Sequence, residues 1–372
     1  MSANEILKEI NLNNNLKKTA TMKNHSSHKN KRRSLRHQFL DPKNAIDDCI
    51  SLNEINCLNA VNYFNSGCRN QLSGEYRESI TAYENAIALN PRFTEAYTNR
   101  GVAKTSLGDF EGAIADHNMS ICLNPKLSEA FYNLGLTKAQ MDDKQGELEG
   151  YNQAIALNPT FTEAWFQRGV AKLELKDNLG ALADLDQAIS LNPDFALAYF
   201  HRGHAKVALG DYPQAVKDYD KAKALDYWIK DVNYYRAIAK MGMGDYPGAI
   251  KDNDEAIRDN PKPFEAHYNR GLAKFEARDY HGAIHDFTFI LKLSPRFGGG
   301  LANLGMAKYE LADFEGAMTA FNQVIKIEPY YANGYYGRGK LHLALGDKEM
   351  ASKDLQKAGE LGMKEAYEIL VD

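Results

Sequence analysis

Proline recurs along this chain at a fixed interval of 34 residues. Seven of the 11 prolines follow this interval: Pro91, Pro125, Pro159, Pro193, Pro261, Pro295 and Pro329. Tyr227 occupies the one position within this series that lacks a proline. A unit of this length cannot bury its apolar face alone, so units of this kind stack on one another. The repeat therefore predicts a stacked array, whereas a length of 372 residues alone would suggest two or three compact domains.

Nine repeats follow when the proline is numbered position 32. Position 8 is Gly or Ala in every repeat, position 16 is acidic in all nine and position 20 is mostly Ala. Small residues let two helices approach closely, and an acidic residue after a Gly-bearing turn caps the second helix. Each repeat is thus predicted to be a hairpin of two helices. Repeats 1 to 9 start at Ala60, Thr94, Ser128, Thr162, Ala196, Lys230, Phe264, Gly298 and Ala332.

Residues 96–125, AYTNRGVAKTSLGDFEGAIADHNMSICLNP, resemble the tetratricopeptide repeat, with its small residues at positions 8, 20 and 27 and its closing proline. The resemblance covers 306 of 372 residues. It implies an all-α fold, a right-handed solenoid (superhelix) of tandem helix-turn-helix hairpins, acting as a non-enzymatic scaffold that binds proteins. Tetratricopeptide cochaperones that grip the carboxylate tails of chaperones use Lys at position 5 and Arg at position 6. Neither residue occurs at these positions here, which excludes that ligand class.

Four segments are expected. Residues 1–40 form a basic tail of net charge +7, whereas residues 41–372 carry −11, and the tail is predicted to be disordered. Residues 41–59 are predicted to form a half repeat, with a second-helix pattern over 41–56 that begins at Asp41 and Pro42. Nine repeats span 60–365. A capping helix is predicted within 364–372, covering the apolar edge of repeat 9.

The repeats also align with one another. Six of them carry Arg at position 7 and Asp at position 23, and the three without this Arg have Ala or Gly at position 23. Correlated presence and absence predicts six salt bridges between the two helices of one hairpin. The pairs are Arg100–Asp116, Arg168–Asp184, Arg202–Asp218, Arg236–Asp252, Arg270–Asp286 and Arg338–Asp354.

A peptide groove is predicted on the first helices. At 100° per residue, positions 5, 9 and 12 share an arc with position 6 beside it, and the resemblance places this arc on the concave surface. Position 6 is rich in side-chain amides, which can donate to and accept from an extended peptide backbone. The predicted contacts at position 6 are Asn99, Asn133, Gln167, His201, Tyr235, Asn269 and Asn303.

Aromatic residues at position 5 are predicted to line the same groove, at Phe166, Phe200, Tyr234 and Tyr268. A second interpretation assigns them to packing between successive hairpins, since an apolar stripe at helical spacing is more often core than site. Tyr227 and Trp228, where the turn proline is missing, are either a docking point or a repacked turn. Gly298, Gly299 and Gly300 open repeat 8, either as a hinge or as a frayed helix start.

No catalytic, cofactor or metal site is predicted. His281 and His285 have the spacing of a helical metal pair but lack a third ligand nearby, and no nucleotide-loop, hydrolase or zinc-protease motif occurs. The predicted partners are proteins rather than small molecules. An alternative function is an adaptor whose residues 28–36, HKNKRRSLR, recruit it to nucleic acid, a membrane surface or an import receptor. The expected location is the cytoplasm, with organelle import as the second possibility.

Overall fold

The computed structural model describes residues 54–259 and 264–371. The first helices of repeats 1 to 9 are α3 (Glu54–Leu72), α5 (Thr94–Leu107), α7 (Ser128–Gln140), α9 (Thr162–Glu174), α11 (Ala196–Ala208), α13 (Val232–Gly242), α15 (Phe264–Glu276), α17 (Gly298–Glu310) and α19 (Ala332–Ala344). The second helices are α4 (Tyr76–Leu89), α6 (Phe110–Leu123), α8 (Lys144–Leu157), α10 (Asn178–Leu191), α12 (Tyr212–Leu225), α14 (Tyr246–Asp259), α16 (Tyr280–Leu293), α18 (Phe314–Ile327) and α20 (Lys348–Glu360). The final helix is α21 (Glu365–Val371).

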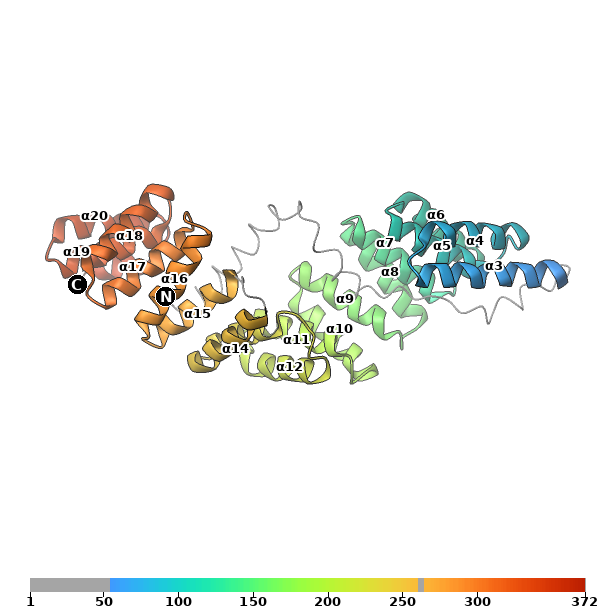
Figure 1. Cartoon of the computed structure of the whole chain (residues 1–372), viewed down its shortest axis with the longest axis horizontal. Helices are drawn as coiled ribbons and strands as arrows, with labels where there is room; N and C mark the ends of the chain where they lie inside the picture. Colours follow the sequence, from blue (N-terminus) through green and yellow to red (C-terminus); the bar gives the residue numbers. More distant parts are fainter. Residues whose placement is uncertain (1–53, 260–263, 372) are drawn as a thin grey trace. The chain divides into compact units, whose positions relative to one another are not determined.

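The described residues divide into two bodies, which we call the N-terminal body (54–209) and the C-terminal body (210–371). The division falls inside repeat 5, so α11 belongs to the first body and α12 to the second. Within each body a first helix packs on its own second helix, which in turn packs on the next first helix (Figure 1). The predicted all-α repeat fold is confirmed.

Each hairpin turn is built from its position 15 and 16 residues. Gly108 adopts a left-handed conformation with φ 85°, and the amide of Asp109 then donates to the carbonyl of Lys104 at 3.0 Å. The Asp109 carboxylate accepts from the amide of Gly112 at 3.0 Å, capping the second helix. Equivalent caps confirm the prediction in repeats 3 to 9, at Asp143, Asp177, Asp211, Asp245, Asp279, Asp313 and Asp347. Glu75 in repeat 1 makes no such bond.

The glycine at position 8 is required by the side chain at position 24. A Cβ on Gly67 would lie 2.5 Å from the ring of Tyr83, and one on Gly271 would lie 2.7 Å from the ring of Phe287. Tyr83 and Phe287 are fully buried. The missing Cβ therefore lets a large ring fill the core of these two hairpins, where full burial of one such side chain contributes about 2–3 kcal/mol.

The ends of the repeat array differ in part from expectation. Helix α3 begins at Glu54, so residues 54–59 of the predicted half repeat belong to the first helix of repeat 1. Cys57 stands where later repeats have proline, and nothing in 54–59 ends a helix. The remaining predictions, for 1–40 and 41–53, lie outside the described residues. At the other end, Ala366 of α21 packs with Leu355 and Ala358 of α20.

Repeats 6 and 8 depart from the regular pattern at their starts. Helix α13 begins only at Val232, after Asp231 with φ 64°, and has 11 residues. In repeat 8, Gly298, Gly299 and Gly300 are buried in the first turn of α17. A Cβ on Gly300 would lie 2.8 Å from Phe297, so close packing accounts for a glycine there.

Candidate protein-interaction surface

First helices of successive repeats contact one another within each body, as α5 with α7 and α17 with α19 do. They form a layer in which position 5 of one repeat faces position 6 of the next. Both predicted groove columns therefore lie at the junctions between hairpins. Side chains that are packed inside these junctions are not available to a partner protein.

The amide column lies inside these junctions. Asn99 and Asn133 are fully buried, Asn269 is 1% exposed, Gln167 is 7% exposed and Asn303 is 8% exposed. The sequence placed these amides on an open groove, and the structure buries them instead. Their contact with a peptide stays a prediction. The two remaining members of the column, His201 and Tyr235, are half-buried.

Tyrosine hydroxyls explain the burial of two of these amides. Asn303 Nδ2 donates to the hydroxyl of Tyr268 in the preceding repeat at 2.9 Å. Gln167 is hydrogen-bonded to Tyr132 in the preceding repeat, whereas Asn269 Nδ2 is buried without a hydrogen-bond partner. Burial raises the pKa of Tyr132 and Tyr234 well above its usual range, so both hydroxyls stay protonated. The pairs join one hairpin to the next.

A signal for this junction is present in the sequence, but only when consecutive repeats are compared. Tyrosine at position 5 is followed by an amide at position 6 of the next repeat, whereas Ala302 is followed by Gly337. Phe166 is followed by His201, and the two rings are 5.5 Å apart. Thr98 is followed by Asn133, whose two side-chain polar atoms are buried without a hydrogen-bond partner.

The predicted groove aromatics are mostly core residues. Phe166, Phe200 and Tyr268 are 2%, 8% and 3% exposed, and Tyr234 is half-buried. Position 5 rings pack against the aromatic at position 34 that precedes the next repeat. The ring centroids are 4.7 Å apart for Phe166–Phe195, 4.8 Å for Tyr132–Phe161 and 5.1 Å for Tyr268–Phe297. The packing interpretation of this column is therefore the one that the structure supports.

Five of the six predicted salt bridges are formed within the described bodies. Asp116 is bound by Arg100 at 2.6 Å, and the equivalent contacts are Arg168–Asp184, Arg236–Asp252, Arg270–Asp286 and Arg338–Asp354. Arg202 and Asp218 fall in different bodies, so that pair stays a prediction.

Sequence reasoning missed two partners of these pairs. Lysine at position 11 binds the same buried carboxylate, as Lys240 does at 2.8 Å from Asp252. The arginine also reaches position 25 of the preceding repeat, as Arg236 does at 2.6 Å from Asp220. Arg236 thus links three helices, and these ion pairs raise its pKa above the usual value although burial opposes this.

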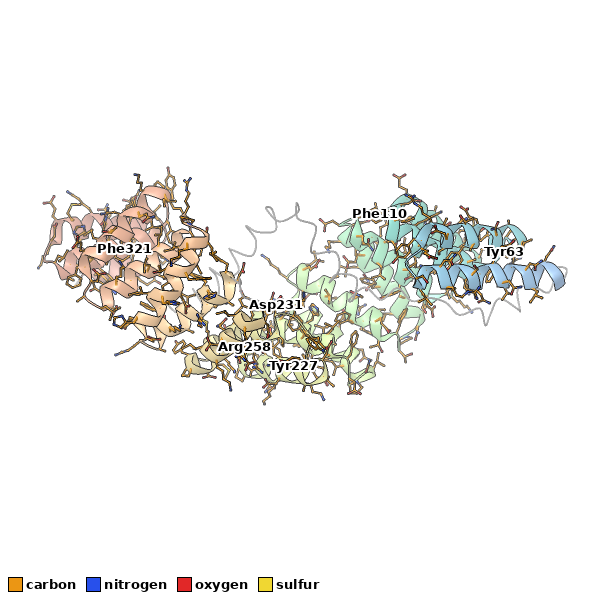
Figure 2. All side chains as sticks on the ribbon, in the orientation of Figure 1. Tyr63, Phe110, Tyr227, Asp231, Arg258 and Phe321 are labelled. Atoms are coloured by element: carbon orange, nitrogen blue, oxygen red, sulfur yellow. The ribbon has the colours of Figure 1, made fainter. Side chains whose placement is uncertain are left out.

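The turn before α13 exposes two aromatic side chains. Tyr227, labelled in Figure 2, is 66% exposed. Trp228 is 79% exposed, and the two ring centroids are 5.7 Å apart. Ile229, next to them, is only 9% exposed and fills the turn. Repacking therefore accounts for Ile229 but not for the two rings. A docking role for Tyr227 and Trp228 stays a prediction.

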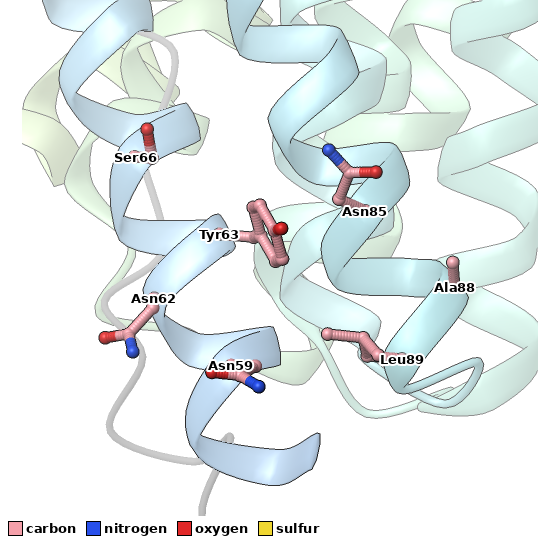
Figure 3. Close-up of a pocket in the computed structure, with 7 residues that line it drawn as sticks. All are labelled: Asn59, Asn62, Tyr63, Ser66, Asn85, Ala88 and Leu89. Carbon is pink, nitrogen blue, oxygen red and sulfur yellow. The ribbon is translucent and has the colours of Figure 1, made fainter. Parts of the chain in front are cut away.

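Some apolar side chains at positions 9 and 12 remain partly exposed on the first-helix layer after the junctions are filled, whereas Val102, Leu136, Ile238, Met241 and Leu272 at the same positions are at most 5% exposed. Val170 and Leu173 of α9 are half-buried, as are Met306 and Tyr309 of α17. In repeat 1, a pocket of about 550 Å³ opens between α3 and α4 beside Tyr63, which is 43% exposed (Figure 3). Its lining is mostly polar: Asn59, Asn62, Tyr63, Ser66, Asn85, Ala88 and Leu89.

In 54–259 and 264–371 no group of three His, Cys, Asp or Glu side chains is arranged to hold a metal ion. No helix in these ranges combines the length and the apolar character needed to cross a bilayer.

Solved structures similar to this chain include bacterial proteins. PilF of Pseudomonas aeruginosa is 13% identical, with a TM-score of 0.53, and the alignment covers 57% of this chain and 97% of PilF. PilW, a type IV pilus biogenesis factor, is 16% identical with a TM-score of 0.51 and coverages of 57% and 97%. MamA is 26% identical with a TM-score of 0.40 and coverages of 47% and 95%. No curated protein sequence matches the chain.

Family models named TPR repeat and tetratricopeptide repeat match residues 72–104, 166–226, 234–295, 305–346 and 332–361. Together these ranges cover more than half of the chain. The stacked helix hairpins and these matches support a protein-interaction scaffold. The chain belongs to the tetratricopeptide repeat family.

Proposed function

We propose that this protein is a non-enzymatic scaffold that binds an extended segment of a partner protein along its first-helix layer. The observation that carries the proposal is the half-buried apolar side chains at positions 9 and 12, exemplified by Val170 and Leu173 in α9. They lie beside filled junctions and keep surface that no neighbouring hairpin covers. An extended segment running across the repeats in which these side chains are half-buried would cover this surface.

The buried amides change how this binding works. A side chain such as Asn303, already hydrogen-bonded to Tyr268, cannot offer the same donor to a ligand without losing that bond. Apolar contact therefore supplies the affinity, and the amides hold the first helices at a fixed spacing. This assigns partner recognition to positions 9 and 12 and a supporting role to positions 5 and 6.

The test is selection of peptides from a random phage library on the full-length chain, followed by affinity measurement by fluorescence anisotropy. We expect Leu173→Asp or Tyr309→Asp to weaken a selected peptide about tenfold, since each puts a charge in an apolar contact. Met119 and Leu157 are 44% and 39% exposed on second helices, and Met119→Asp and Leu157→Asp are the matched controls. Equal loss in the controls, or no loss in the first pair, rejects the first-helix layer as the site.

A further inference from the structure

A column of exposed apolar side chains runs along the hairpin turns, at position 14. Seven of nine repeats have Leu or Met there, between 36% and 53% exposed: Leu107, Met141, Leu175, Leu209, Met243, Leu311 and Leu345. We call the first three, all in the N-terminal body, the turn stripe. Leu179, at the start of α10, is 70% exposed.

Helix capping does not account for apolar residues at this position, and packing covers only about half of each side chain. The turn closes through backbone groups of positions 11, 12, 15 and 16, as in the bond from the Asp177 amide to the Lys172 carbonyl at 2.9 Å. The side chain at position 14 takes no part in that pattern. Almost half of each Leu or Met remains in water, where a polar residue would serve the fold equally well.

Acidic side chains surround the turn stripe. Positions 13 to 18 of repeats 2 to 4 hold six acidic residues and two lysines, a net charge of −4: Asp109, Glu111, Asp142, Asp143, Glu174 and Asp177 against Lys144 and Lys176. Asp109, Asp143 and Asp177 use one carboxylate oxygen for the helix cap. Asp143 also binds Lys138 at 3.0 Å, and Glu174 binds Lys144. An apolar edge with negative charge at every repeat fits a segment that alternates cations with large apolar side chains.

Residues 31–40 of this chain, KRRSLRHQFL, have that composition. They carry four cations and no acid, a net charge of +4, together with Leu35, Phe39 and Leu40. Thirteen residues lie between Leu40 and Glu54, where α3 begins, and the fourteen steps from one Cα to the other span about 48 Å when fully extended. Helix α3 is about 28 Å long and neighbouring helices pack at about 10 Å, so the segment reaches the turns of repeats 2 to 4.

We propose that residues 31–40 dock on the turn stripe of their own chain, with Leu35 and Phe39 on Leu107, Met141 and Leu175. The arginines and Lys31 then lie beside Asp109, Asp143 and Asp177. The basic segment is thereby held on an edge distinct from the first-helix layer.

Zero-length carbodiimide coupling on the full-length chain tests this placement, because it joins a lysine to a carboxylate only where they touch. Lys29 and Lys31 should couple to Asp109, Asp143 or Asp177 within one chain, as read by peptide mass spectrometry. The triple variant Leu107→Ser, Met141→Ser and Leu175→Ser should reduce this coupling about tenfold. The triple variant Met243→Ser, Leu311→Ser and Leu345→Ser, at the same position in the C-terminal body, should leave it unchanged.

Both variants must first give melting curves that match the parent chain within a few degrees. A coupling yield that is the same in both variants overturns the proposal, as does coupling of Lys29 and Lys31 mainly to other carboxylates. Products that join two chains and vanish on dilution assign the stripe to a second copy, which also overturns it.

Discussion

Asn303 Nδ2 and the hydroxyl of Tyr268 are 2.9 Å apart and belong to different repeats. Asn303 is 8% exposed and Tyr268 is 3% exposed, so the bond is made away from water. The bond shows that the position 6 side chain of repeat 8 connects this hairpin to the preceding one. An amide that a single-helix projection assigns to a ligand thus has a partner in the neighbouring repeat.

Tyr268→Phe should destabilise the C-terminal body, because it leaves a buried amide donor unpaired while keeping the ring. The expected loss in the free energy of unfolding is about 1–3 kcal/mol, measured by urea denaturation of the full-length chain. Tyr63→Phe is the control, since Tyr63 is 43% exposed and its hydroxyl can bond to water. Equal stability of the two variants would show that the bond contributes nothing.

Asn133→Leu should have the opposite effect and raise stability by about 1–3 kcal/mol. Both polar atoms of Asn133 are buried without a partner in the chain, because Thr98 stands where other repeats have a tyrosine. Leucine has similar volume and no polar group to desolvate. Asn303→Leu is the matched control and should destabilise, since it strands the Tyr268 hydroxyl. Loss of stability at position 133 would contradict the prediction.

Arg236→Leu should cost about 2 kcal/mol, measured as above. The carboxylate of Asp252 is 1% exposed, and Lys240 at 2.8 Å would remain to offset only part of its charge. Adding Asp252→Gly should recover most of the loss, because Leu134 and Gly150 already form this combination in repeat 3. There the position 11 lysine, Lys138, binds the cap Asp143 at 3.0 Å instead.

The double variant decides between two accounts of these ion pairs. If the losses of the Arg236 and Asp252 substitutions add, the two residues contribute independently and the correlated occurrence has another cause. If the double variant is more stable than Arg236→Leu alone, the two residues are coupled. The loss in Arg236→Leu then comes from leaving the Asp252 carboxylate without its arginine.

The Arg–Asp pairs could be predicted from the sequence because both members lie in one hairpin, in a frame without insertions. The helix caps at position 16 could also be predicted, because this position directly follows the turn within the same hairpin. The fate of Asn99 and Asn303 could not be read from one helix, because the partner lies in the preceding hairpin. Comparing Tyr268 with Asn303 and Ala302 with Gly337 across repeat boundaries would have revealed it.

The beginning of α3 illustrates a different limit. Periodicity alone placed a turn before Ala60, since every later repeat has one there. A turn needs a residue that ends the preceding helix, and residues 54–59 contain neither proline nor glycine. The local sequence of this segment therefore decides its structure, and residues 54–59 extend the first helix where the repeat spacing predicted a turn.

Acidification should destabilise the N-terminal body through His201 and His204. Burial lowers the pKa of His201 to about 4 and that of His204 well below its usual value. The unfolded chain has ordinary histidines with a pKa of about 6.5, so below that pH it binds more protons than the folded chain. Stability should therefore be constant above about pH 7 and fall progressively as the pH is lowered from 6.5 towards 4.

The variant His201→Asn with His204→Val should remove this pH dependence. Asparagine is the residue at position 6 in five other repeats, and valine occupies position 9 in Val102 and Val170. Urea unfolding at pH 7 and pH 5 should show a smaller difference in the variant than in the parent chain. His267, whose pKa is also lowered by burial, is common to both chains and cancels in the comparison. An unchanged pH difference would mean that protonation acts elsewhere, and that the packing of His201 against Phe166 tolerates the charge.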